Sequence, residues 1–186
     1  MVIQGSTPET ALRRAVFLDR DGVINKSLIR NGRPYAPTAL TDFEILPGVA
    51  GALLKLRRAG YLNIVVTNQP DIKTGKQSPE ILQLMHERLA KELALDDIQC
   101  CPHTDEDQCT CRKPHPGMLL DATERLQIDL SASWMIGDRW SDIAAGQAAG
   151  CRCFFIDHGY VERQPEPPFS RAASLPEAVD EIVGMI

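Results

Sequence analysis

Two aspartates separated by one residue follow a short apolar run near the start of the sequence. Residues 15–18 are uninterruptedly apolar and predict a buried strand, and Asp19 and Asp21 come directly after them, before Gly22. Alternate residues of an extended segment point to the same side, so the two carboxylates can share one small volume. Carboxylates this close repel each other unless a cation lies between them or one is protonated. A hard cation such as Mg²⁺ binds such oxygen ligands, whereas the simpler alternative is an acidic loop after a core strand.

Short apolar runs alternate with amphipathic segments along the chain, and this alternation predicts the fold. Strands are expected at 15–18, 62–67, 98–101, 134–136 and 151–156, and helices at 49–59, 79–95, 116–127, 141–149 and 174–186. Ser78 and Pro79 predict the cap and first turn of the 79–95 helix, and Leu84 is expected on its apolar stripe. The alternation predicts an α/β fold with a mainly parallel sheet. The length of 186 residues favours one domain spanning 1–186, with a core at about 15–160 and a tail that ends in the last helix.

Three segments lack this periodicity. Residues 1–14 are expected to form a loose or helical lead-in, with a possible helix start at Thr7 and Pro8. Residues 25–46 contain Asn31 followed by Gly32, a pair typical of a tight hairpin, and predict a small flap beside the two aspartates. Residues 157–173 are rich in proline and predict irregular structure.

Polar residues follow several of the expected strands, where ligands of parallel sheets bind. Asp19 and Asp21 follow the first strand, Thr67 ends the second, and Asp138 follows the 134–136 run. Lys113 adds a cation from a loop. A carboxylate can attack phosphorus, and catalysts of phosphoryl transfer surround the group with Mg²⁺, lysine and hydrogen-bond donors. This set of residues predicts phosphoryl-transfer chemistry.

A second cluster consists of thiols and an imidazole. Within eleven positions the chain carries Cys101, His103, Cys109 and Cys111. This donor set suits a closed, tetrahedral, structural zinc site, and metal binding would fold a polar loop that cannot pack by itself. The alternative is a set of unrelated reduced cysteines.

Three other cysteines are expected outside this cluster. Cys100 is next to Cys101 and should face the opposite side of its strand. Cys151 and Cys153 lie in an apolar run and are interpreted as small buried hydrophobic residues.

The motifs resemble those of the haloacid-dehalogenase (HAD) superfamily of phosphatases. The matching features, in the same order, are D-x-D-G-V at 19–23, the strand-end Thr67, Lys113, and G-D-x-x-x-D at 137–142. The resemblance covers residues 15–160 and implies a three-layer Rossmann-like fold without a large cap domain.

The resemblance also implies a role for each matching residue. Asp19 would be the nucleophile and a Mg²⁺ ligand, and Asp21 would be the general acid/base, binding the metal through its backbone carbonyl. Thr67 and Lys113 would hold the phosphoryl oxygens. Asp138 would complete the metal site, with Asp142 supporting its shell rather than binding directly.

The short zinc-type loop runs directly into Arg112 and Lys113. In this it resembles the zinc-containing HAD branch of heptose 1,7-bisphosphate and histidinol-phosphate phosphatases, which implies that Arg112 and Asn68 bind substrate. Pro70 and Asp71 depart from that branch's usual T-N-Q-S-G sequence, so the substrate stays open. Heptose 1,7-bisphosphate is the leading interpretation, with histidinol phosphate or another sugar phosphate as alternatives. A zinc-stabilised binding module without catalysis is the non-enzyme alternative, and dehalogenation fits poorly.

Composition limits the partners of the protein. A net charge of −5 and a pI near 5.4 argue against binding nucleic acid, which takes clustered Lys and Arg. No apolar run approaches the roughly 18 residues that suggest a membrane span, and residues 1–12 do not resemble a secretion signal. The expected partner is a small phosphorylated metabolite. A cytoplasmic monomer with an open site is expected.

Overall fold

A computed structural model describes residues 12–185. The expected helix start at Thr7 and Pro8 lies outside these residues. The described chain is organised around a six-stranded sheet in which every neighbouring pair of strands is parallel, in the order β5-β4-β1-β6-β7-β8. The strands are β1 (Arg14–Leu18), β4 (Tyr61–Asn68), β5 (Asp97–Cys101), β6 (Trp134–Gly137), β7 (Arg152–Ile156) and β8 (Ser170–Ala172). The predicted α/β class and parallel sheet are confirmed.

The strand order reverses at the centre of the sheet. From β1 the chain continues to β4 and β5 on one side, and β6, β7 and β8 extend the sheet on the other side. A crevice forms at the carboxyl ends of strands where the winding reverses, and ligands bind there. In this protein the reversal lies between β1 and β6, whose carboxyl ends lead directly into Asp19 and Asp138.

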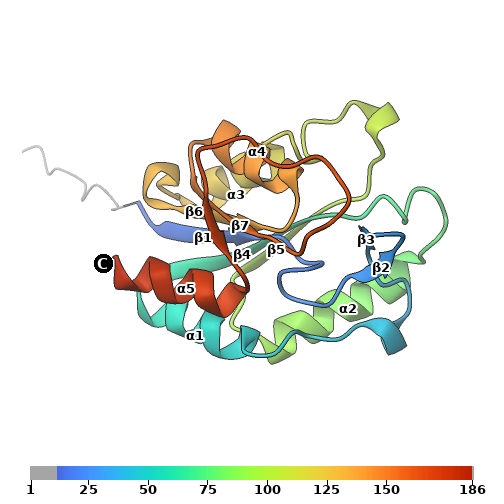
Figure 1. The fold of residues 1–186 in the computed structure, drawn as a ribbon, viewed down its shortest axis with the longest axis horizontal. Coiled ribbons are helices and arrows are strands. Elements are labelled where there is room, and N and C mark those ends of the chain that lie inside the picture. The colour runs from blue at the N-terminus through green and yellow to red at the C-terminus, as the bar shows by residue number, and fades with distance from the viewer. Residues whose placement is uncertain (1–11, 186) are drawn as a thin grey trace, which may run out of the picture.

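Helices cover both faces of the sheet and complete three layers (Figure 1). One face carries α1 (Val49–Arg58), α2 (Pro79–Glu92) and α5 (Leu175–Gly184), and the other carries α3 (Gly117–Leu126) and α4 (Trp140–Ala149). Each face has its own apolar cluster, because alternate residues of a strand point to opposite faces. Val16 and Leu18 of β1 belong to one cluster, and Ala15 and Phe17 belong to the other.

The helix starts follow the chemistry of their first residues. Ser78 caps α2 by accepting the backbone N–H of Ile81 at 3.2 Å, and Pro79 occupies the first turn, as predicted. The helix ends at Glu92, three residues before the predicted end at residue 95. It buries Leu82, whereas Leu84, expected on the apolar stripe, is 46% exposed.

The predicted flap between β1 and α1 is confirmed. It contains the hairpin of β2 (Leu28–Arg30) and β3 (Arg33–Tyr35), followed by the 3₁₀ helix η1 (Leu40–Asp42). Asn31 and Gly32 both have positive φ, 51° and 74°, which is the backbone that a two-residue hairpin loop requires. The flap is too short to be a cap domain, and its residues 33–36 form part of the wall of the cavity described below.

The segment after β7 is not wholly irregular, because Ser170–Ala172 forms β8 and pairs with Phe154, Phe155 and Ile156 of β7. Two further 3₁₀ helices, η2 (Asp105–Asp107) and η3 (Leu130–Ala132), lie in loops. Among the helices in residues 12–185, none combines the length and the apolar character that a membrane span requires.

Candidate active site

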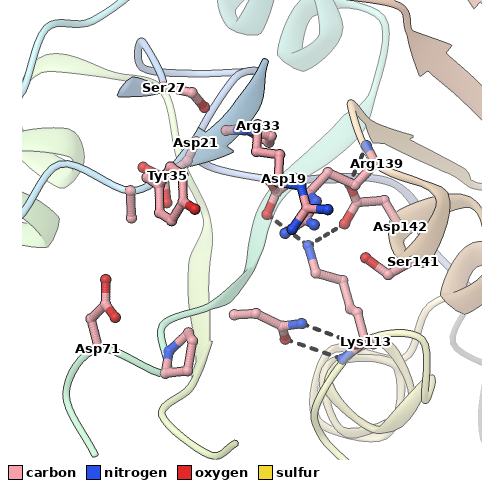
Figure 2. A pocket seen from close by; sticks show the side chains of 14 residues that line it. Asp19, Asp21, Ser27, Arg33, Tyr35, Asp71, Lys113, Arg139, Ser141 and Asp142 are labelled. Carbon is pink, nitrogen blue, oxygen red and sulfur yellow. Dashed lines mark hydrogen bonds and ion pairs between the residues drawn. The ribbon is translucent and has the colours of Figure 1, made fainter. Parts of the chain in front are cut away.

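A cavity of about 330 Å³ opens beyond the carboxyl ends of the central strands. Figure 2 shows Lys113 and Asp142 on one side of this site and Tyr35 and Asp71 on the other. The side chains that line it come from several stretches of the sequence: Asp19, Asp21, Ser27, Arg33, Pro34, Tyr35, Ala36, Asn68, Pro70, Asp71, Lys113, Arg139, Ser141 and Asp142. Of the polar residues expected to converge here, Asp19, Asp21 and Lys113 line the cavity, whereas Thr67 and Asp138 are not part of its lining.

Three buried carboxylates form one cluster beside the cavity. Oxygens of Asp19, Asp138 and Asp142 all lie within 4.8 Å of one another. Lys113 Nζ donates to Asp19 Oδ1 and pairs with Asp142 Oδ1, both at 2.6 Å (Figure 2). It also donates to the carbonyl of Val66 at 2.7 Å. When all three carboxylates are ionised, they carry two more negative charges than Lys113 balances.

Burial and like charge raise the pKa values of these carboxyls. Burial, together with the charges of Asp142 and Asp21, raises the pKa of Asp19 from 3.8 to about 6, although Lys113 acts in the opposite direction. Burial, with the charges of Asp19 and Asp142, raises the pKa of Asp138 well above its ordinary value. Burial lowers the pKa of Lys113, but Asp142 and Asp19 raise it by more, so the lysine remains a cation.

These residues fit a hard divalent cation. Asp138 Oδ1 is buried and has no hydrogen-bond partner in the part of the chain that the structure describes. The donors in the cluster are oxygens only, which Mg²⁺ prefers. The excess of two negative charges equals the charge of one divalent ion, so Asp19, Asp138 and Asp142 can hold Mg²⁺.

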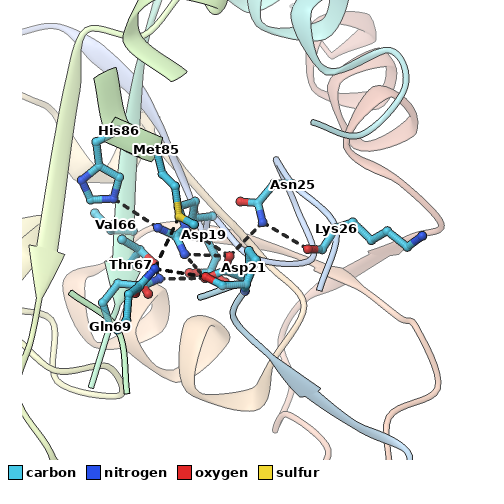
Figure 3. A network of polar contacts seen from close by, with 12 residues as sticks. Asp19, Asp21, Asn25, Lys26, Val66, Thr67, Gln69, Met85 and His86 are labelled. Carbon is cyan, nitrogen blue, oxygen red and sulfur yellow. Dashed lines mark hydrogen bonds and ion pairs between the residues drawn. The ribbon is translucent and has the colours of Figure 1, made fainter. Parts of the chain in front are cut away.

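The carboxylate of Asp21 lies outside this cluster and is held by its own donors. Arg20 Nη2 donates to both Asp21 oxygens at 2.9 Å, Asn25 Nδ2 donates to Oδ1 at 2.8 Å, and Gln69 Nε2 donates to Oδ2 at 2.7 Å. Figure 3 shows Asn25 and Gln69 on either side of Asp21. These bonds fix the orientation of Asp21 at the cavity wall.

The fully buried guanidinium of Arg20 has a neutral neighbour on its other side. Arg20 Nη1 lies 3.3 Å from His86 Nε2. Burial, and then the charge of Arg20, lower the pKa of His86 to about 4, so the imidazole accepts from Arg20 without adding charge. Neither Arg20 nor His86 was singled out from the sequence, because nothing in the pattern brings α2 to β1.

Thr67 and Asn68, at the end of β4, have different surroundings. Thr67 is 1% exposed, its hydroxyl accepts from Gln69 Nε2 at 2.9 Å, and it does not line the cavity. Asn68 lines the cavity, but both ends of its amide bond the backbone of Lys113, Nδ2 to the carbonyl at 3.0 Å and Oδ1 to the N–H at 3.1 Å. Asn68 thus fixes the backbone position of Lys113.

Arg112 is not among the residues that line the cavity. Its Nε donates to Asp105 at 2.6 Å and its Nη1 donates to the carbonyl of His103 at 3.2 Å, so its guanidinium braces the cysteine-rich loop. The cavity lining instead includes Arg33 from β3 and Arg139 from the start of α4, which the sequence patterns did not reveal. No local signal marks them, since both reach the cavity only through the tertiary fold.

The two arginines differ in their partners. Arg139 forms an ion pair with Glu162, with Nη2 to Oε2 at 2.5 Å. Arg33 pairs with no carboxylate among residues 12–185 and is exposed on the hairpin. The charge of Arg33 is therefore available to an anion in the cavity.

The cysteine-rich loop forms a compact donor cluster. Cys111 Sγ lies 3.1 Å from Cys101 Sγ, 3.4 Å from Cys109 Sγ and 3.3 Å from His103 Nδ1. Sulfur ligands at 2.3 Å from a tetrahedral zinc ion would lie roughly 3.7 Å apart, close to these separations. All six cysteines are free thiols, so these four residues can hold a zinc ion.

The remaining cysteines follow their predicted environments. Cys151 and Cys153 are 8% and 4% exposed and pack in the apolar cluster beneath α3 and α4, which confirms their interpretation as buried hydrophobic residues. Cys100 lies outside the metal-type cluster.

Comparisons with known proteins agree with this geometry. The family described as HAD-hydrolase-like matches residues 110–181. The D-glycero-beta-D-manno-heptose-1,7-bisphosphate 7-phosphatase of Escherichia coli (strain K12) is 40% identical over 147 residues, which cover 73% of this chain and 74% of that protein. The corresponding alpha-heptose enzyme of Photorhabdus laumondii is 37% identical over 165 residues, covering 82% of this chain and 87% of that protein.

A solved structure extends the similarity to nearly the whole chain. The D,D-heptose 1,7-bisphosphate phosphatase of B. bronchiseptica, complexed with magnesium and phosphate, has a TM-score of 0.78 and 26% sequence identity, covering 93% of this chain and 99% of that one. With the sequence relatives, this similarity shows that the chain belongs to the HAD-like hydrolases, in the family of the heptose-1,7-bisphosphate 7-phosphatases, and is a phosphatase.

Proposed function

We propose that the protein is a Mg²⁺-dependent phosphatase that hydrolyses the 7-phosphate of D-glycero-D-manno-heptose 1,7-bisphosphate. The observation that carries this proposal is the cluster of Asp19, Asp138, Asp142 and Lys113 in a chain that is 40% identical to a phosphatase named for that substrate. One relative is named for the beta heptose and another for the alpha heptose. Together they support a heptose substrate without selecting one anomer.

In the proposed reaction Asp19 attacks phosphorus and forms an aspartyl-phosphate. Lys113 holds Asp19 Oδ1 at 2.6 Å, which orients the nucleophile and places positive charge beside the phosphoryl oxygens. Asp21 protonates the leaving sugar oxygen and then deprotonates the water that hydrolyses the aspartyl-phosphate. Thr67, whose hydroxyl is bonded to Gln69, is retained as a phosphoryl-binding residue in this proposal.

Two metal ions complete the proposal. Asp19, Asp138 and the backbone carbonyl of Asp21 would bind Mg²⁺, with Asp142 supporting that shell. When bound, the ion would neutralise charge on the phosphoryl group. The four-residue cluster of Cys101, His103, Cys109 and Cys111 would bind a structural Zn²⁺.

The cations of the cavity support a substrate with two phosphates. Lys113 is engaged by Asp19 and Asp142, and Arg139 by Glu162, whereas Arg33 lines the cavity without a carboxylate partner in residues 12–185. A guanidinium binds phosphate through charge-assisted hydrogen bonds. In this proposal the second phosphate lies toward Arg33 on the hairpin, and Asn68 and Arg112 keep their predicted substrate roles.

Histidinol phosphate is the second candidate substrate. Asp71 lines the cavity on the loop after β4, where its carboxylate can receive a substrate ammonium group. Its only described ion pair, with Lys76, has a separation of 4.0 Å, which is a weak competitor for such a group.

A substrate panel tests the proposed function. Purified protein is assayed with Mg²⁺ on both heptose 1,7-bisphosphate anomers, heptose 7-phosphate, histidinol phosphate and simple sugar phosphates. We expect a heptose bisphosphate to have the highest kcat/KM, by about tenfold or more over heptose 7-phosphate, because a charged hydrogen bond contributes that much. Preference for histidinol phosphate would replace the proposed substrate, and no hydrolysis of any compound would favour a binding module.

We also propose that residues 1–186 act as one domain and as a cytoplasmic monomer that binds neither nucleic acid nor membrane. Asp19, Asp138, Asp142 and Lys113 meet within a single chain, so the proposed site does not require a partner subunit. Six cysteines, none of them in a disulfide, support a reducing compartment.

A further inference from the structure

The segment 157–161, which follows β7, runs from the β7–β8 edge of the sheet toward the residues after Asp19. Asp157, at its start, forms an ion pair with Arg171 of β8. The N–H of Val161, at its end, donates to the carbonyl of Gly32 in the hairpin at 2.8 Å. Residues 157–161 therefore link the edge of the sheet to the flap, and the proposed mechanism assigns them no role.

Within this segment Tyr160 contacts a carboxylate of the proposed metal site. Its hydroxyl donates to Asp138 Oδ2 at 2.9 Å. Asp138 is 1% exposed, and its other oxygen, Oδ1, has no hydrogen-bond partner within residues 12–185. One oxygen is thus held by Tyr160, and the other is left without a partner in the carboxylate cluster.

Close packing around the hydrogen bond between Tyr160 and Asp138 restricts the movement of both side chains. A Cβ atom at position 22 would lie 1.8 Å from Asp138 Oδ2 and 3.1 Å from Tyr160 Oη, so Gly22 closes one side of the contact. Gly22 itself is held by His158, whose Nε2 donates to the Gly22 carbonyl at 2.8 Å. The phenol ring lies beside the imidazole of His158, with centroids 5.3 Å apart.

We propose that Tyr160 is a positioning residue for the metal site: it holds Asp138 Oδ2, so that Oδ1 is directed to the cation. The inference rests on the Mg²⁺ site of the proposed function. Residues that orient metal ligands by hydrogen bonds tune the affinity of the site, and their loss typically costs 10- to 100-fold in metal affinity or activity. Without the hydroxyl, the carboxylate of Asp138 can rotate, and its affinity for the cation falls.

The test compares two tyrosine variants that lose the same atom. Tyr160→Phe removes the hydroxyl beside Asp138, and Tyr61→Phe removes one from the start of β4, away from the cavity. Mg²⁺ binding to each zinc-loaded protein is measured by calorimetry without phosphate, and the rate on the best substrate is measured against Mg²⁺ concentration. We expect Tyr160→Phe to weaken Mg²⁺ binding by about 10- to 100-fold, with excess Mg²⁺ restoring most of kcat, and Tyr61→Phe to bind like the wild type.

The alternative role for the hydroxyl is structural only. In that case Tyr160→Phe would lower the Tm of the metal-free protein and leave its Mg²⁺ affinity unchanged, which would overturn the inference. An equal loss of affinity in Tyr61→Phe would overturn it as well. A wild-type protein that binds no Mg²⁺ would remove the metal site and this role together, whereas one that binds Mg²⁺ but hydrolyses no heptose bisphosphate would contradict only the proposed substrate.

Discussion

The two metal-type clusters of this protein are built in opposite ways. Asp19 and Asp138 follow β1 and β6, and Asp142 lies in the first turn of α4, where its Oδ2 accepts the N–H of Arg139 at 2.9 Å. All three carboxylates are buried. In the cysteine-rich cluster only Cys101 belongs to a strand, and the other three ligands are on a loop and partly exposed.

The carboxylate cluster is positioned by the fold itself, whereas the cysteine-rich loop depends on its metal for order. The sheet and α4 hold the carboxylates together in spite of their repulsion, so a cation there relieves charge without having to shape the chain. The loop that carries His103, Cys109 and Cys111 has only the short η2 as regular structure, so a bound metal would supply its order. The loop then delivers Lys113, two residues after Cys111, to the carboxylates.

The largest effect is expected from the nucleophile. Asp19→Asn removes the attacking oxygen and one charge from the carboxylate cluster, and the rate should fall by at least about a thousandfold. Zinc content, measured by atomic absorption, and the circular dichroism spectrum should stay as in the wild type, because the cysteine-rich cluster is separate. Substantial residual hydrolysis would show that Asp19 is not the nucleophile.

A smaller effect is expected when the cysteine-rich cluster is broken. Cys109→Ser should lose zinc and loosen the loop, and the resulting displacement of Lys113 should lower kcat/KM by about a hundredfold. The loss should stay below that of Asp19→Asn, because Asn68 still bonds the backbone of Lys113.

Cys100→Ser is the matched control for this variant. It changes a neighbouring thiol outside the cluster and should keep both zinc and activity. If Cys109→Ser retained the wild-type rate after losing its zinc, the two sites would be independent.

The smallest effect concerns pH and the carboxylate cluster. The folded-state pKa of Asp19 is raised from the ordinary 3.8 to about 6, so between these values the folded protein holds a proton that the unfolded chain releases. Stability without Mg²⁺ should therefore decrease as pH rises through this window, by at most about 1.4 kcal/mol per pH unit for this group.

Mg²⁺ binds the ionised carboxylates, so it should raise the Tm more at about pH 8 than at about pH 5, by a few degrees. Differential scanning calorimetry of zinc-loaded protein measures both shifts. In Asp19→Asn, which lacks the titrating carboxyl, the dependence of the Mg²⁺ shift on pH should be weaker. An equal Mg²⁺ shift at both pH values would contradict the assigned cluster.

Local signals were sufficient to predict most elements of the fold. Four consecutive apolar residues marked β1, and Ser78 with Pro79 marked the start of α2, because these signals act within one or two turns of chain. The strand β8 was missed since Ser170–Ala172 is short and polar and gains its place only by pairing with β7. The burial of Leu82 instead of Leu84 likewise depends on how α2 sits on the sheet.

The candidate site divides in the same way. The motif residues Asp19, Lys113 and Asp138 converge as predicted, because the carboxyl ends of parallel strands share one edge. Sequence could not show that Arg112 bonds Asp105, or that Arg33 and Tyr160 reach the site. Those contacts depend on the tertiary positions of the cysteine-rich loop, the hairpin and residues 157–161.

The space at Gly22 has a consequence for how the sequence can vary. A side chain there would meet Asp138, 116 positions further along the chain, and the hydroxyl of Tyr160, and the φ of +92° already disfavours any residue but glycine. The residue at position 22 is therefore constrained by the side chains at positions 138 and 160. A laboratory evolution experiment that replaces Gly22 should recover function by reversion far more often than by change at either partner, because neither can shrink without losing the bond that joins them.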